Sequence, residues 1–69
     1  MDTNVYKTVE LTGASTESLE HAINTAIERA SKTIRGMKWF SVESIRGDIG
    51  DDSAVHYQVT LKVGFKIDG

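Results

Sequence analysis

Trp39 is the first residue of this sequence that suggests binding chemistry. It is the only tryptophan of the 69-residue chain, and it falls on the polar side of a predicted strand. An indole in that position is either an anchor for a second subunit or a platform on which a flat ligand stacks. The position alone slightly favours the subunit anchor, and both interpretations stay open.

Gln58 is expected on the same face, near the middle of the neighbouring strand. Its side-chain amide offers one acceptor and two donors. It could therefore accept a hydrogen bond from the N–H of a flavin pyrimidine edge while donating one to an adjacent carbonyl. The alternative is a solvated glutamine on an exposed strand, which would be favoured if no tryptophan were nearby.

Arg46 and His56 could border the same ligand. The planar guanidinium of Arg46 can bond two phosphate oxygens at once. An ion pair with Glu43, Asp48 or an acid of another chain would explain the arginine equally well. His56 could contact a ligand or titrate near neutral pH, although a surface histidine without a special role is the more common case.

The sequence does not indicate an enzyme or a metal site. It has no cysteine, and His21 and His56 cannot form a zinc site by themselves. No Ser-His-Asp arrangement has support from its spacing, and the six glycines are scattered rather than gathered in a phosphate-binding loop. A catalytic role would have to rest on a bound cofactor.

Chain length, cysteine content and net charge limit which kinds of protein this can be and which partners it can bind. A chain of 69 residues is expected to form one domain, 1–69, and small domains usually need disulfides, metals or partner subunits for stability. Without cysteine, we expect a homo-oligomer in the cytoplasm. The net charge of -2 argues against a nucleic-acid partner. We also expect neither a membrane span, which would need roughly 20 apolar residues, nor a signal peptide.

Four segments must position these side chains. Three alternate between apolar and polar residues as strands do, and one carries an apolar stripe at helical spacing. Ser15 or Thr16 is expected to cap the start of the helix, and Gly36 its end. The predicted ranges are 3–12 for the first strand, 16–35 for the helix, 38–49 for the second strand and 54–67 for the third.

The predicted fold class is α+β, with the order β-α-β-β. The last strand is the longest and most apolar, so we expect it at the centre of a three-stranded antiparallel sheet (order 1-3-2) packed on one helix. In the second strand, Ile45 and Ile49 fall on the wrong side, which predicts a bulge or strong twist between Val42 and Ile45.

The lengths of these elements predict surface that the single chain cannot cover. A strand of about fourteen residues spans roughly 45 Å, whereas a helix of about twenty spans roughly 30 Å. One end of the sheet should therefore need cover from another chain. The residues expected there are Val63, Phe65 and Ile67, or else Val55 and Tyr57.

The chain resembles the dodecin family over essentially its full length. The likeness is carried by WFSVESIRG at residues 39–47 and by HYQVTLKVGF at residues 56–65. Two shorter segments, VYK at 5–7 and AIERA at 26–30, also match.

The resemblance implies a hollow dodecamer, built as a tetramer of trimers, that stores flavins in pairs at two-fold interfaces. Trp39 would stack on each ring, Gln58 would contact the pyrimidine edge, and Arg46 would contact the phosphate of FMN. Riboflavin or another flavin is an alternative ligand, and coenzyme A could share the surface. The implied role is flavin storage or sequestration with photoprotection, because an indole close to the ring can quench its excited state.

Two other functions remain as alternatives. A small flavin-dependent oxidoreductase would need an open flavin face for its substrate and a group that transfers protons. A structural or partner-binding module would use Trp39 as a protein contact and would bind no flavin.

Overall fold

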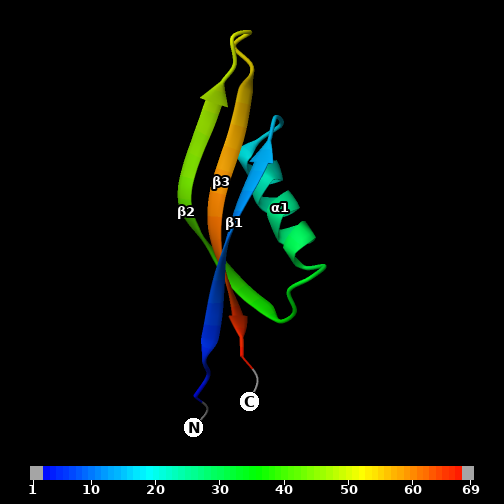
Figure 1. The fold of residues 1–69 in the computed structure, drawn as a ribbon, viewed down its shortest axis with the longest axis vertical. Coiled ribbons are helices and arrows are strands. Elements are labelled where there is room, and N and C mark those ends of the chain that lie inside the picture. The colour runs from blue at the N-terminus through cyan, green and yellow to red at the C-terminus, as the bar shows by residue number, and fades with distance from the viewer. Residues whose placement is uncertain (1–2, 68–69) are drawn as a thin grey trace.

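The computed structural model describes residues 3–67, which form three strands and one helix (Figure 1). The strands make one antiparallel sheet in the order β1-β3-β2. The predicted fold class and strand order are therefore confirmed. The elements are β1 (Tyr6–Ser15), α1 (Leu19–Ala30), β2 (Met37–Ile49) and β3 (Val55–Lys66).

The helix begins later than the sequence predicted. Ser18 is its N-cap, and the Ser18 Oγ accepts a hydrogen bond from the His21 N–H at 3.0 Å. The predicted start at residue 16 is wrong because β1 continues through Ser15, which pairs with Tyr57 of β3. Neither Ser15 nor Thr16 is therefore the cap.

The helix also ends earlier than predicted, at Ala30 rather than at residue 35. Ser31 is its C-cap, and the chain leaves through turns in which the Ile34 N–H donates to the Ala30 carbonyl at 2.8 Å. Gly36 is not the cap. It lies directly before β2 with a φ of 76°, in the left-handed region that glycine adopts without a steric penalty.

The predicted irregularity in the second strand is a β-bulge at Glu43. Val42 pairs with Leu61, but the next pair is Ser44 with Thr60, so Glu43 is an extra residue in β2. Because of this extra residue, side chains of β2 after Glu43 point to the opposite face from the one that strict alternation would give them. Ile45 is thereby brought to the same side of the sheet as its partner Val59.

The core lies between α1 and the β1–β3 part of the sheet. Ala22, Val59 and Leu61 are completely buried there, and four partly buried residues of α1 pack against them. Gly13 allows the close approach, because a Cβ at that position would meet the Ala22 carbonyl oxygen. The four residues of α1 are Leu19, Ile23, Ala26 and Ile27.

The helix leaves a large part of the sheet uncovered. Its 12 residues span about 18 Å, whereas the 12 residues of β3 span about 40 Å. The side of β2 that continues the core carries exposed apolar residues, and Ile45 and Ile49 are 58% and 78% exposed. The sequence did not indicate this surface of β2. Its exposed residues are Phe40, Val42, Ile45 and Ile49, which we call the β2 apolar face.

The predicted overhang is correct only in part. Ile67 and Val55, at opposite ends of β3, are exposed, so both ends of the sheet extend beyond the helix. Phe65 and Tyr57 are half-buried. Val63 is only 2% exposed, so its assignment to the overhang was wrong.

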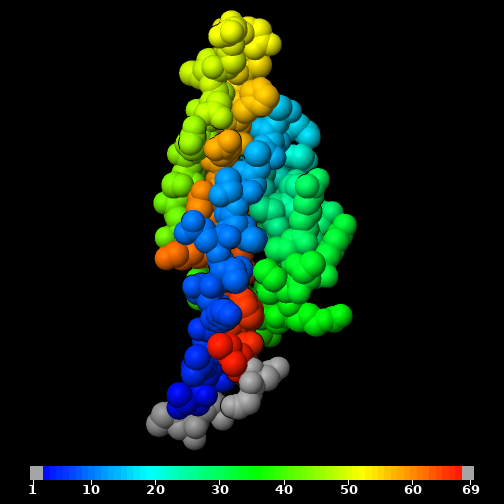
Figure 2. Space-filling view, in the orientation of Figure 1, coloured from blue at the N-terminus to red at the C-terminus, as the bar shows by residue number. Residues whose placement is uncertain are grey.

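The molecule is elongated, with extents of 56 × 21 × 14 Å. Its radius of gyration is 14.6 Å, against about 11 Å for a compact domain of this length. The β2–β3 hairpin projects past the helix at one end of the space-filling view, and the start of β1 projects at the other (Figure 2). In the described residues, no helix has both the length and the apolar character needed to cross a membrane.

Candidate functional site

We call the side of the sheet opposite α1 the outer face. The register places Trp39 of β2 beside Gly64 of β3, and Arg46 beside Gln58. Asp48 and His56 form another pair, two residues further along each strand. All four residues singled out in the sequence, Trp39, Arg46, His56 and Gln58, thus belong to β2 and β3.

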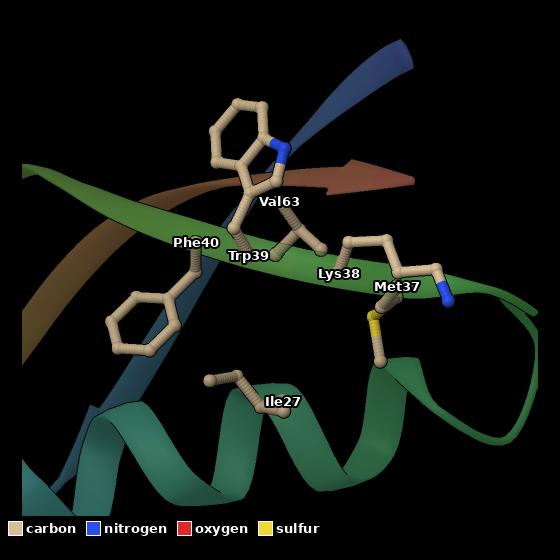
Figure 3. A pocket seen from close by; sticks show the side chains of 6 residues that line it. All are labelled: Ile27, Met37, Lys38, Trp39, Phe40 and Val63. Atoms are coloured by element: carbon tan, nitrogen blue, oxygen red, sulfur yellow. The ribbon is translucent and has the colours of Figure 1, made fainter. Parts of the chain in front are cut away.

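The indole of Trp39 projects away from α1, whereas the side chains of Phe40 and Met37 point toward it (Figure 3). Trp39 is 44% exposed. The ring lies over Gly64, because a Cβ added to that glycine would overlap the indole. One part of the ring is therefore supported by the sheet, and the rest is open to a planar ligand or to another chain.

A groove of about 300 Å³ lies beside Trp39, between β2 and α1. It is largely apolar, and in Figure 3 Phe40 and Ile27 approach each other across it. Because the indole points the other way, this groove is separate from the open part of the ring. Its lining residues are Ile27, Met37, Lys38, Trp39, Phe40 and Val63.

Asp48 joins the two polar candidates of the outer face. Arg46 Nη2 donates to Asp48 Oδ1 at 2.8 Å, and Gln58 Nε2 donates to Asp48 Oδ2 at 3.4 Å. The Arg46–Asp48 ion pair, which was one of the alternatives for Arg46, is thus present in the single chain. Both side chains are at least half exposed, so this pair contributes little to stability.

A second cavity, of about 410 Å³, opens beside this polar group. One of its walls comes from the junction of β1 and α1, where no sequence pattern indicated a site. The pairing of Ser15 with Tyr57 brings that junction next to Gln58, and this register was not evident from the sequence. The cavity is lined by Ala14, Ser15, Thr16, Glu17, His21, Asp48, His56 and Gln58.

The same junction contains a Ser-His-Glu contact that the spacing of the residues did not suggest. Ser15 Oγ lies 2.7 Å from His21 Nδ1, and His21 Nε2 lies 3.3 Å from Glu17 Oε2. Ser15 Oγ also accepts the backbone N–H of Glu17 at 2.9 Å. These exposed contacts are explained by the turn that leads into α1, which they stabilise.

Trp39 and Gln58 do not meet within one chain. The residue beside Trp39 is Gly64, which is six residues from Gln58 along β3. At about 3.3 Å per residue, the two positions are roughly 20 Å apart. A stacked flavin ring is much shorter than this distance, so one chain alone cannot offer both side chains to one ring.

Comparison with known proteins gives a consistent family assignment. The Dodecin family model matches residues 5–68. A curated dodecin of Thermus thermophilus is 53% identical over 64 residues, which are 93% of each chain. Crystal structures of variants of the T. thermophilus dodecin, with a tryptophan or an arginine replaced, also match this chain.

Solved structures agree with this chain in fold as well as in sequence. A crystal structure of a T. thermophilus protein has a TM-score of 0.89 at 51% identity, covering 97% of this chain and 98% of the other. The dodecin of Streptomyces davaonensis has a TM-score of 0.90 at 38% identity, covering 99% and 100%.

A more distant structure is a calcium dodecin from Mycobacterium tuberculosis, described as calcium-chelating. It has a TM-score of 0.83 at 26% identity, covering 93% of this chain and 91% of the other. Within residues 3–67 of the present chain, no three His, Cys, Asp or Glu side chains are grouped as metal ligands. From the match to residues 5–68 and the 53% identity to a curated member, we conclude that this chain belongs to the dodecin family.

Proposed function

We propose that this protein binds FMN, or a closely related flavin, at interfaces between its own subunits. The observation that carries the proposal is the half-exposed indole of Trp39 on the outer face, supported from below by Gly64. An aromatic ring held in this way offers a stacking surface to a planar ligand. Membership in the dodecin family adds the expectation of flavin storage.

The distance between Trp39 and Gln58 favours a site made by two subunits. A two-fold axis near the middle of β3 would lay two sheets antiparallel, with their outer faces together. Trp39 of one subunit would then lie near Gln58 of the partner subunit, and the reverse pair would form a second site. This arrangement would give each interface two equivalent flavin sites. It would also make Trp39 both a subunit contact and a ligand platform.

Arg46 and His56 belong to the polar end of the proposed site. In the sheet register Arg46 lies beside Gln58, and His56 lies beside Asp48. His56 also lines the cavity of about 410 Å³. The guanidinium is suited to the phosphate of FMN, which would replace the carboxylate of Asp48 as its partner.

The proposed assembly is a homo-oligomer, and the family resemblance implies a dodecamer built from trimers. The β2 apolar face supports association, because this much exposed apolar surface is unusual on a small monomer. The elongated shape supports it as well, because most of the sheet lies beyond the reach of α1.

We propose storage or sequestration of the flavin in the cytoplasm rather than catalysis. A ring enclosed between an indole and the facing subunit has no open face for a substrate. The nearby indole would also quench the excited flavin by electron transfer, which would protect the cell from its photochemistry.

The proposal is tested by titrating flavin-free protein into FMN and following the loss of FMN fluorescence. We expect strong quenching by the original chain and none by Trp39→Ala. Tyr6→Ala is the matched control, because Tyr6 is also aromatic and also 44% exposed, but lies on β1. FMN binding by Trp39→Ala that is as tight as that of the original chain would refute the proposed site.

A further inference from the structure

Gly64 is buried directly beneath the indole of Trp39, its partner in the register of β2 and β3. A Cβ built on Gly64 would overlap Cε2 and Cζ2 of the ring and would lie 2.5 Å from Nε1. Atoms in contact normally stay about 3.5–4.0 Å apart. No side chain therefore fits at position 64 while the indole keeps its place.

The contact is made by the face of the ring. The ring atom nearest to the added Cβ is Cε2, which lies where the two rings of the indole are fused, between Cζ2 and Nε1. If the added Cβ met the edge of the ring instead, Cζ2 and Nε1 would be at least as close to it as Cε2 is. One face of the indole thus rests on the strand, while the side chain remains 44% exposed.

The backbone itself does not require glycine at position 64. Among the described glycines, positive φ is found at Gly36 and not at Gly64. Glycine inside a strand is destabilising relative to alanine, since it loses more backbone entropy and has no side chain to pack. The space taken by the indole is what accounts for this glycine.

We propose that Gly64 is the positioning residue of the Trp39 platform. By allowing the ring to rest on the backbone, it sets the height and tilt of the indole, and hence the width of the slot in which a planar ligand stacks. The ligand part of this inference rests on the proposed function, whereas the placement of the ring does not. A methyl group at position 64 would lift the indole by roughly 1 Å or more.

Gly64→Ala tests this inference, with Gly47→Ala as the matched control. Gly47 also lies in the sheet, but a Cβ there would meet its nearest atoms at an ordinary 3.6 Å. We expect Gly64→Ala to elute from a sizing column as the original chain does. Its near-ultraviolet circular dichroism and tryptophan emission, measured without flavin, should change, because Trp39 is the only tryptophan. Its FMN affinity should fall about tenfold or more, and Gly47→Ala should change neither property.

An unchanged tryptophan spectrum in Gly64→Ala overturns the inference, and so does a changed spectrum with unchanged FMN affinity. If the original chain binds no FMN, the proposed function fails, while the flavin-free spectrum still decides whether Gly64 positions Trp39. If Gly64→Ala does not fold, the change is made in a Trp39→Ala background, where the obstacle is gone. That double variant should melt at or above the temperature of Trp39→Ala alone, because alanine is favoured over glycine in a strand. A lower temperature would show that the strand requires glycine at position 64 for a reason other than Trp39.

Discussion

Asp48 forms hydrogen bonds with Arg46 and Gln58, the two side chains proposed to contact a phosphorylated flavin. Its carboxylate accepts from Arg46 at 2.8 Å and from Gln58 at 3.4 Å. In the proposed complex both donors exchange this partner for the ligand. The exchange costs little, because an exposed ion pair of this kind is worth at most about 1 kcal/mol.

Arg46→Ala should distinguish FMN from riboflavin, which lacks the phosphate. Hydrogen bonds to charged groups are the strong ones, so we expect FMN affinity to fall about tenfold while riboflavin affinity stays nearly constant. Fluorescence-quenching titrations with the two flavins measure both values. Arg35→Ala, at an exposed arginine outside the site, is the control, and an equal loss for both flavins would exclude the phosphate contact.

The secondary structure elements show where sequence patterns suffice and where they do not. The bulge at Glu43 could be predicted because Ile45 and Ile49 break the alternation of β2, and alternation is a local property. The start of α1 could not be predicted, because several residues near position 16 are good helix caps. Pairing with Tyr57 extends β1 through Ser15 and excludes that residue, and the hydrogen bond from the His21 N–H identifies Ser18 as the cap.

The cap assignment can be checked with two alanine variants. Ser18→Ala removes the acceptor for the His21 N–H and should lower the free energy of unfolding by about 1 kcal/mol. Thr16→Ala should change it by much less, since Thr16 lies outside the helix. Thermal unfolding followed by circular dichroism measures both, and a larger loss for Thr16→Ala would mean that the helix begins earlier.

At the scale of the whole molecule, the strands that carry the candidate residues could be predicted from the sequence, but the distance between those residues could not. Trp39 and Gln58 were expected on neighbouring strands, and the structure places them on β2 and β3, which pair with each other. Their separation along β3 depends on which residue lies beside Trp39, and the bulge at Glu43 shifts that pairing by one residue. The β2 apolar face was missed for a related reason, since its extent depends on how far α1 reaches across the sheet.

Association through the β2 apolar face can be tested by introducing a charged residue into that face. Ile45→Asp should give a smaller species in sedimentation velocity, because burying an unpaired carboxylate in an interface is strongly unfavourable. Asn24→Asp adds the same charge to an exposed position of α1 and should sediment as the original chain does. An oligomer of unchanged size in Ile45→Asp would show that this face lies outside the subunit contacts.

The central claim is that Trp39 of one subunit and Gln58 of the partner subunit hold the same flavin. Trp39→Ala and Gln58→Ala chains, each defective alone, can be co-expressed with different tags and the mixed oligomers purified through both. Fluorescence titration of the mixed oligomers with FMN is the direct measurement. We predict that tight binding returns at a fraction of the sites, because one site of each mixed pair regains an intact tryptophan and an intact glutamine. Mixed oligomers that bind FMN no better than the two single variants would contradict the claim.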